Sequence, residues 1–227
     1  MAKSGTTPKI IVMIGPPGVG KGTQSRLLAE HCSYPQISTG DILREMARME
    51  TRLGLQIKAT LSAGQLVSDE VLASVILTRT TQPDCKDGYI LDGYPRTLTQ
   101  ARMLEKLARG QGKEVRLVSI VVPRDALMKR LTGRRTCVQC GEIYNLYLRP
   151  PKQERTCDLC GGSLAHRADD NAETVGTRLA AYEYATAPLV EYYRQSDRLI
   201  EVDGDRPVQV VFNDLLKAIE AQGGSPE

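Results

Sequence analysis

The chain has 227 residues but contains no Trp, only one Phe and only two His. With so few aromatic side chains, the hydrophobic core must consist mainly of Leu, Ile, Val and Ala. Neither His31 nor His166 stands in a recognisable acid–base pattern, so we expect no mechanism that depends on imidazole chemistry. Thirty Lys and Arg against 27 Asp and Glu leave a net charge of +3. This balance excludes a protein that coats a polyanion with its whole surface, and we expect no nucleic-acid partner.

Long apolar runs are also missing. The longest, residues 10–14 and 117–122, fall far short of the roughly 18 residues that a membrane-spanning helix requires. The first nine residues lack the apolar segment and cleavage site of a secretion signal. We therefore expect a cytoplasmic protein with no membrane partner. Disulfides are disfavoured in a reducing cytosol, so the six cysteines should serve other purposes.

Strand-like and helix-like segments alternate along the chain. Short β-type runs occur at residues 9–14, 36–38, 89–91, 116–121 and 198–202. The segments between them carry apolar residues at helical spacing. This alternation predicts an α/β fold with a doubly wound parallel sheet of about five strands. Functional loops are then expected at the carboxyl ends of the strands.

Two stretches interrupt the alternation, one rich in helical patterns and one rich in Cys, Gly and Pro. We predict a single domain over residues 1–227, with a core formed by 1–37, 68–132 and 168–227, a helical insertion over 38–67 and a small lid insertion over 133–167. A long helix should follow Asp170 and run towards Gln195, with a kink at Pro188.

Residues 15–21 read Gly-Pro-Pro-Gly-Val-Gly-Lys, directly after an apolar strand and at the start of a helix. In this context the string predicts a phosphate loop, because glycines let backbone N–H groups point at phosphate and Lys21 adds a cation. An ordinary glycine-rich turn is the alternative. Gly22 stands where Ser or Thr is usual, which moves the expected hydroxyl ligand of Mg²⁺ to Thr23.

Four cysteines form two CxxC pairs, Cys137 with Cys140 and Cys157 with Cys160, separated by sixteen residues. This spacing predicts two knuckles that hold one tetrahedral Zn²⁺. Four thiolates leave no coordination position for water or substrate, so the metal should be structural. Fe(II) fits the same geometry, and free thiols or disulfides are the remaining alternatives.

Residues 15–24, Gly-Pro-Pro-Gly-Val-Gly-Lys-Gly-Thr-Gln, resemble the phosphate loop of adenylate kinases, which also have a glycine after the lysine. Further segments resemble motifs of that family and occur in the family's order. They are Ser38-Thr-Gly-Asp-Ile-Leu-Arg44, Leu66-Val-Ser-Asp-Glu70, Leu91-Asp-Gly-Tyr-Pro-Arg-Thr97, Gly133-Arg-Arg135, Arg167-Ala-Asp-Asp170 and Ala187-Pro-Leu189. The resemblance covers nearly the whole chain and is closest to members with a four-cysteine, zinc-binding lid.

The resemblance implies Mg²⁺-dependent transfer of the ATP γ-phosphoryl group to AMP, giving two ADP, in a monomer. It implies an insertion over 38–67 that binds the nucleoside monophosphate. An AMP phosphate is already an anionic nucleophile, so positioning and charge neutralisation suffice and no general base is needed. The implied catalytic residues are Lys21, Asp92, Arg96, Arg130, Arg134, Arg167 and Arg178. Among these, Arg130, Arg167 and Arg178 would close over the phosphates, and Asp92 would hold Mg²⁺ through water.

The resemblance also implies the residues of the two nucleotide sites. The ATP site would comprise Gly18, Val19, Gly20, Lys21, Gly22, Thr23, Arg134, Ile143, Tyr144 and Arg206. The AMP site would comprise Thr39, Arg44, Gln65, Leu66, Val67, Gly93, Arg96, Gln100, Arg167 and Arg178, with Gln100 and the backbone of 65–67 contacting adenine. Tyr144 could equally belong to the lid core, and Asp169 and Asp170 either cap a helix or engage lid groups.

Two alternatives stay open at this point. One is a nucleoside monophosphate kinase with another base specificity, such as a GMP, UMP or CMP acceptor or a GTP donor. The other is a P-loop ATPase whose cysteine pairs and flanking arginines form a nucleic-acid-binding zinc ribbon. The second alternative does not account for the segment 91–97.

Overall fold

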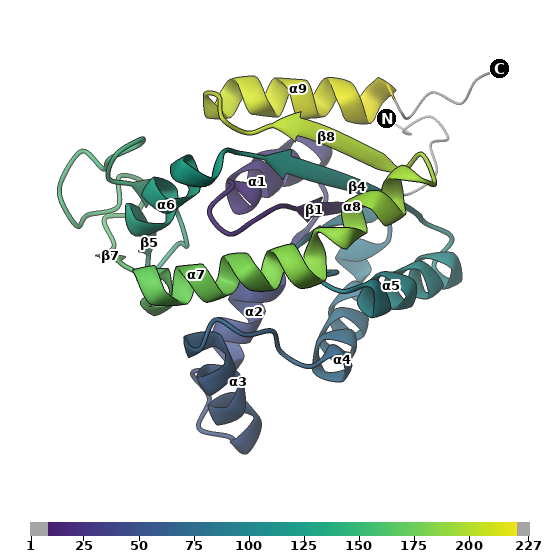
Figure 1. Ribbon diagram of the computed structural model, residues 1–227, viewed down its shortest axis with the longest axis horizontal. Coiled ribbons are helices and arrows are strands. Elements are labelled where there is room, and N and C mark those ends of the chain that lie inside the picture. The colour runs from purple at the N-terminus through teal and green to yellow at the C-terminus, as the bar shows by residue number, and fades with distance from the viewer. Residues whose placement is uncertain (1–8, 222–227) are drawn as a thin grey trace.

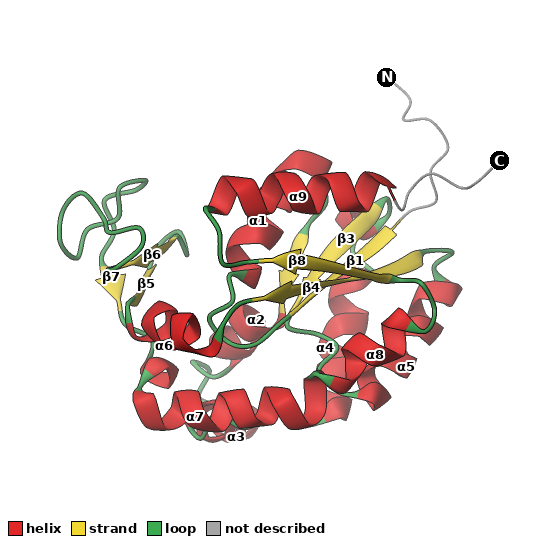
Figure 2. Cartoon of the chain, turned by 45° about the horizontal axis from the view of Figure 1, so that its top comes forward, coloured by secondary structure: helices red, strands yellow, loops and turns green. Residues whose placement is uncertain are grey.

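The computed structural model describes residues 9–221, so the ends of the predicted core, 1–8 and 222–227, lie outside the described residues. A five-stranded parallel sheet in the order β2-β3-β1-β4-β8 forms its centre (Figure 2). The strands are β1 (Lys9–Ile14), β2 (Gln36–Ser38), β3 (Gly88–Asp92), β4 (Glu114–Val121) and β8 (Leu199–Asp203). The predicted α/β fold with a parallel sheet of about five strands is therefore confirmed.

Nine α-helices are found within residues 9–221, and most of them cover the two faces of the sheet (Figure 1). They are α1 (Lys21–Cys32), α2 (Thr39–Met46), α3 (Arg52–Ser62), α4 (Asp69–Thr80), α5 (Leu98–Gly110), α6 (Arg124–Thr132), α7 (Ala172–Ala181), α8 (Pro188–Arg194) and α9 (Val208–Ala221). Alternate residues of β1 enter opposite cores: Ile10 belongs to one hydrophobic cluster and Ile11 to the other. Burial on both faces explains why the central strands read as continuous apolar runs.

Helices α2 and α3 project from the sheet (Figure 1) and belong to the helical stretch expected after β2. Side chains cap both N-termini, as Ser38 accepts a hydrogen bond from Asp41 N and Thr51 accepts one from Gly54 N. These caps satisfy N–H groups that a helix start leaves free, which fixes where each helix begins. Helix α4 returns the chain to the sheet.

The cysteine-rich segment folds into a separate three-stranded antiparallel sheet in the order β6-β5-β7. Its strands are β5 (Arg134–Cys137), β6 (Ile143–Asn145) and β7 (Leu164–Ala165). Figure 1 shows this lid at one end of the molecule, next to α6. Its buried cluster contains only Cys137, Tyr144, Cys157 and Leu164. So small a core does not stabilise an independent fold without further cross-linking.

The long C-terminal helix predicted after Asp170 is present but is not uniformly α-helical. Helix α7 passes into a π-helical turn, Tyr182–Thr186, before α8 begins at Pro188. The N–H of Ala187 donates to the carbonyl of Tyr182 at 2.9 Å. Proline lacks an N–H and crowds the preceding turn, so the widened turn accommodates Pro188 where a kink was predicted. No helix among the described residues is both long and apolar enough to cross a membrane.

Candidate active site

The loop between β1 and α1 has the backbone conformation of an anion cradle. Gly15, Gly18 and Gly20 all have positive φ, and a Cβ on Gly15 would lie 2.7 Å from the carbonyl oxygen of Ile120. No side chain caps the N-terminus of α1. Its N–H groups and the positive end of the helix dipole therefore remain available to phosphate oxygens.

Lys21 folds back over this loop. Its Nζ donates to the carbonyl oxygens of Gly15 at 2.8 Å and Pro16 at 3.1 Å. Burial lowers the pKa of Lys21 to about 8, although the carboxylate of Asp92 opposes the change and nearby arginines reinforce it. An anionic ligand would stabilise the charged form of this half-buried ammonium among other cations.

Asp92 ends β3 beside the phosphate loop. A Cβ on Gly22 would lie 3.4 Å from Asp92 Oδ2, which places the carboxylate at the start of α1. Burial raises the pKa of Asp92, and Lys21 partly offsets this. Thr39 Oγ1 donates to the main-chain carbonyl of Asp92 at 3.1 Å. The Asp92 carboxylate, together with the hydroxyl of Thr23, the residue after Gly22, offers the kind of oxygen ligands that Mg²⁺ requires.

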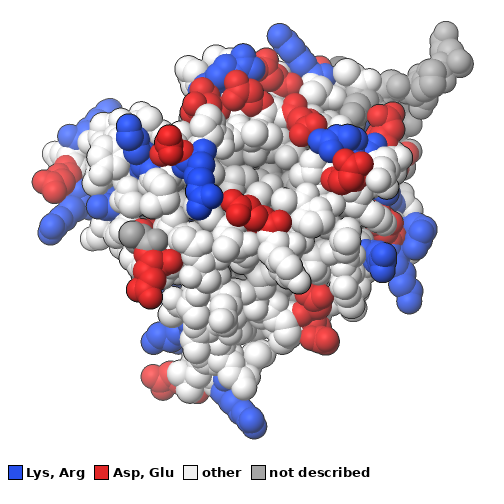
Figure 3. All heavy atoms as spheres, viewed as in Figure 1, with Lys and Arg blue, Asp and Glu red and all other residues white. Residues whose placement is uncertain are grey.

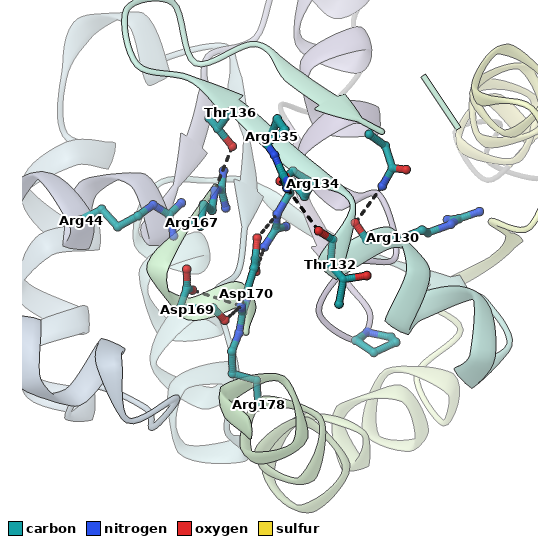
Figure 4. A network of polar contacts seen from close by, with 12 residues as sticks. Arg44, Arg130, Thr132, Arg134, Arg135, Thr136, Arg167, Asp169, Asp170 and Arg178 are labelled. Atoms are coloured by element: carbon teal, nitrogen blue, oxygen red, sulfur yellow. Dashed lines mark hydrogen bonds and ion pairs between the residues drawn. The ribbon is translucent and has the colours of Figure 1, made fainter. Parts of the chain in front are cut away.

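Arg134 and Arg178 converge on the Asp170 carboxylate from two different elements, β5 and α7 (Figure 4). The distances are 2.7 Å from Arg134 Nε and 2.8 Å from Arg178 Nη1. The Asp170 side chain is fully buried. Burial alone would raise its pKa, yet the hydrogen bond from Arg134 and the charge of both arginines hold the pKa below its usual value. Asp170 thus ties the base of the lid to α7.

Two further arginines of the predicted site lack a carboxylate partner among the ion pairs of residues 9–221. Arg167 Nε donates to Thr136 Oγ1 at 3.1 Å, and Figure 4 shows its guanidinium turned towards that of Arg44. Arg96 Nε donates to the carbonyl of Gly93 at 2.8 Å. Burial lowers the pKa of Arg167 to about 10 and also lowers that of Arg96, with other arginines adding to both effects. Half-buried guanidinium groups that repel one another indicate a site for a polyanion.

The acceptor side of the site is built around the turn after β3. A Cβ on Gly93 would lie 2.9 Å from Thr39 Oγ1 and 3.1 Å from Arg96, so only glycine fits there at its φ of 83°. Gln100, in the first turn of α5, is fully buried. The loop with Gln65, Leu66 and Val67 runs from α3 to α4. Arg44 is bonded to Asp41 on its own helix.

Three predicted site residues take other positions. Arg130 donates to the carbonyls of Val19 at 3.0 Å and Gly204 at 2.9 Å, and Figure 4 shows it pointing away from the other arginines. These hydrogen bonds hold Arg130 at the carbonyls of Val19 and Gly204, and its closing over the phosphates stays a prediction. Tyr144 is buried in the lid, where its Oη accepts from Asp158 N at 2.8 Å. This is the lid-core alternative. Arg206 pairs with Asp203 and Asp214.

The four lid cysteines lie together, with all their Sγ atoms within 4.8 Å of one another. Cys137 Sγ lies 3.5 Å from Cys160 Sγ, and Cys140 Sγ lies 3.6 Å from Cys157 Sγ. A tetrahedral ion with metal–sulfur bonds of about 2.3 Å requires a sulfur–sulfur separation of about 3.8 Å, so the cluster fits. The backbone N–H of Cys140 lowers the pKa of Cys137. These residues could hold a metal ion, as their spacing predicted.

A contact between the lid and α1 was not foreseen from the sequence. Glu142, buried at the end of the first cysteine knuckle, forms an ion pair with Arg26 of α1 and accepts a hydrogen bond from Arg149 at 2.6 Å. Arg26 also donates to the carbonyl of Gly141 at 3.1 Å. The pair is separated by 116 residues, and nothing in the local pattern marks it. It holds the lid against the helix that begins at the phosphate loop.

Glu142→Gln should loosen this contact and raise the KM for MgATP about twofold to fivefold, the range given by partly exposed ion pairs. The effect should shrink at high salt, where partly exposed charges are screened. Arg26→Gln and the double variant complete a cycle, and the coupling is read from KM values. Glu154→Gln, an exposed lid change of equal charge, is the control. Additive effects of the two substitutions would contradict a direct pair.

Asp170→Asn should lower the free energy of unfolding by about 3 kcal/mol, because it leaves Arg134 and Arg178 without their buried counter-ion. Since the folded-state pKa lies below the unfolded value, the contribution is complete above about pH 4 and is lost on further acidification. Urea titrations measure the change. ADP should reduce the loss, since its phosphates supply the missing negative charge. Asp169→Asn, which removes a pair to Arg178 alone, should cost less. Equal losses in both variants would refute the assigned role of Asp170.

The fold and the site together define a class: a P-loop phosphotransferase in which a glycine-rich loop, converging arginines and a lid surround one polyanion site. The adenylate kinase family profile matches residues 13–198. The chain is 46% identical to an adenylate kinase of Methanosarcina acetivorans, covering 93% of this chain and 98% of that protein. It is 43% identical to one of Archaeoglobus fulgidus, covering 92% and 97% respectively. The chain belongs to the adenylate kinase family of nucleoside monophosphate kinases.

Proposed function

We propose that this enzyme transfers the γ-phosphoryl group of MgATP to AMP, reversibly, and that the lid holds a structural zinc ion. The observation that carries the proposal is the convergence of Lys21 and of arginines from several separate segments on one site. Burial and neighbouring arginines lower the pKa values of Lys21, Arg96 and Arg167, so together these groups favour a ligand with several negative charges. Two nucleotides placed phosphate to phosphate are such a ligand.

The positions of the site residues suggest a separate role for each group of them. The phosphate loop and Lys21 would bind the β- and γ-phosphates, and Asp92 with Thr23 would hold Mg²⁺, which neutralises charge on the transferred group. Arg96 and Arg44 lie on the acceptor side and would orient the AMP phosphate. Arg134 and Arg167 lie at the base of the lid and Arg178 lies on α7. These three arginines would neutralise the charge of the phosphoryl group during its transfer. The phosphate of AMP is already an anionic nucleophile, so the transfer would need no general base.

The lid would act by excluding water. Its residue Ile143 already lies over the phosphate loop, because a Cβ on Gly22 would come 3.6 Å from Ile143 Cδ1. Water in the site would hydrolyse ATP without productive transfer.

Cytoplasmic location and a monomeric state stay predictions from the sequence. Figure 3 shows positive and negative side chains interspersed on the face that it presents, with no broad basic surface there.

The test is product formation from MgATP with AMP, GMP, UMP or CMP, each run separately beside a control without acceptor. ADP formation that requires both AMP and Mg²⁺ supports the proposal. Preference for another acceptor would keep the mechanism but overturn the AMP assignment. Hydrolysis that needs no acceptor and is stimulated by nucleic acid would favour an ATPase with a zinc ribbon instead.

A further inference from the structure

The hydroxyl of Tyr144 lies against the cysteine cluster of the lid. Tyr144 is the middle residue of β6 and is 1% exposed. Its Oη lies 3.6 Å from Cys157 Sγ and accepts a hydrogen bond from the backbone N–H of Asp158 at 2.8 Å. The tyrosine follows the first cysteine pair in the chain, whereas Cys157 and Asp158 belong to the second pair and its turn. One side chain therefore connects the two halves of the cluster.

The hydrogen bond from Asp158 indicates where the hydroxyl proton of Tyr144 goes. A hydroxyl has one proton to donate and two lone pairs that accept. The Asp158 N–H uses a lone pair, so the proton is left for another acceptor. Within residues 9–221, the only other hydrogen-bonding partner of this hydroxyl is Cys157 Sγ. A cysteine that binds a metal is a deprotonated thiolate and has no proton to donate. With a metal at the cysteines, Tyr144 is therefore the donor and Cys157 the acceptor.

The surroundings of the Tyr144 ring restrict where its hydroxyl can lie. The ring belongs to the buried cluster of the lid, together with Cys137, Cys157 and Leu164. The guanidinium of Arg149 lies over the ring, 5.3 Å from its centre, and a cation is attracted to the face of an aromatic ring. Packing and this cation together keep the hydroxyl at the sulfur.

The two cysteine pairs differ in the hydrogen bonds that reach their sulfur atoms. The first cysteine of each pair, Cys137 or Cys157, accepts hydrogen bonds from two backbone N–H groups of its own CxxC turn. Cys157 has Tyr144 as a further partner, whereas no side-chain hydroxyl is bonded to Cys137 in the described part of the chain. A hydrogen bond to a metal-bound sulfur withdraws charge from it and fixes its direction. This extra effect falls on Cys157 alone of the two.

We propose that Tyr144 is a positioning residue of the metal centre, whose hydroxyl donates to the Cys157 thiolate and holds this ligand in the direction that the ion requires. The inference rests on the proposed function, in which the lid holds a structural zinc ion. Tyr144 would not bind the ion itself, because the four thiolates complete a tetrahedral site. It would act through Cys157, as the outer partners of metal ligands do in other proteins.

Tyr144→Phe is the test, because it removes the hydroxyl and keeps the ring. The dissociation constant for Zn²⁺, measured by competition with a chromophoric chelator, should rise about 10- to 100-fold. In the Co²⁺-loaded protein, the sulfur-to-cobalt charge-transfer band should move to longer wavelength, because a thiolate without this hydrogen bond gives up electron density more easily. Tyr147→Phe, which removes the hydroxyl of a 64% exposed tyrosine of the same lid, should match the parent in both measurements.

The parent protein tests the metal site itself. A parent that binds neither Zn²⁺ nor Co²⁺ at the cysteines would remove the zinc ion from the proposed function. A parent that binds both, with a Tyr144→Phe variant of unchanged affinity and unchanged charge-transfer band, would overturn the inference alone. Weaker affinity with an unmoved band would also overturn it, because Tyr144 would then support the lid without acting on the sulfur.

A second substitution covers the case in which Tyr144→Phe does not bind cobalt. Incorporation of 3-fluorotyrosine at position 144 keeps the ring and the hydroxyl but makes the hydroxyl a stronger donor. The charge-transfer band should then move to shorter wavelength, opposite to the shift expected for Tyr144→Phe. A band at the parent position would overturn the inference.

Discussion

Lys21→Met should lower kcat about 10²- to 10³-fold, the loss seen when one preorganised donor is removed from a transition-state site. Lys21 is the cation placed across the phosphate loop, hydrogen-bonded to its carbonyls and buried beside Asp92. Methionine keeps much of the aliphatic volume and removes the charge. Initial rates of ADP formation, measured over a range of MgATP and AMP concentrations, give kcat and KM separately.

The control for this variant is Lys106→Gln, an exposed lysine on α5, which should retain the parent rate. Thermal melting should show that Lys21→Met folds at least as well as the parent, since an ammonium buried at a depressed pKa destabilises the folded state below about pH 8. A variant with kcat within twofold of the parent would mean that the phosphates bind elsewhere.

Removal of the metal should have the second large effect. The buried lid cluster has four residues, two of them cysteines, so we expect the lid to depend on the cross-link that a metal at the four cysteines would provide. Cys157→Ser, or treatment with a chelator, should unfold the lid and lower kcat/KM about 10²-fold, because Arg134 and Arg167 at its base lose their positions. Elemental analysis of the purified protein establishes which metal is bound and its stoichiometry.

The matched control is Cys32→Ala, at the end of α1 and outside the cluster. Limited proteolysis locates the change: cleavage should appear within residues 133–167 in Cys157→Ser while the core stays intact. Full activity and an unchanged melting temperature after complete metal removal would show that the cysteines do not need an ion.

Much of the framework was predictable from short stretches of sequence. The apolar runs of β1 and β4 gave the parallel sheet, since strands covered on both faces must be apolar throughout. The phosphate loop follows from glycines at positive φ and one lysine, all within seven residues. The cysteine pairs predicted their own cluster because a CxxC knuckle is a local turn and four thiolates satisfy one tetrahedral ion.

The directions of individual side chains were not predictable in this way. Arg130 and Arg134 are four residues apart, yet one turns to the carbonyls of Val19 and Gly204 and the other to Asp170. Arginine has the same chemistry on a surface and in a site, so only packing distinguishes the two. Tyr144 likewise needed the structure to place it in the lid core.

The elements, their order, the phosphate loop and the cysteine pattern can be read from the chain alone, because each depends on residues that are close together in it. Which distant groups meet is visible only in the folded chain: Glu142 with Arg26, Asp170 with Arg134 and Asp69 with Gln100. These contacts require the packing of the sheet and its insertions, and their energies depend on burial. Burial belongs to the folded chain and not to any segment of its sequence.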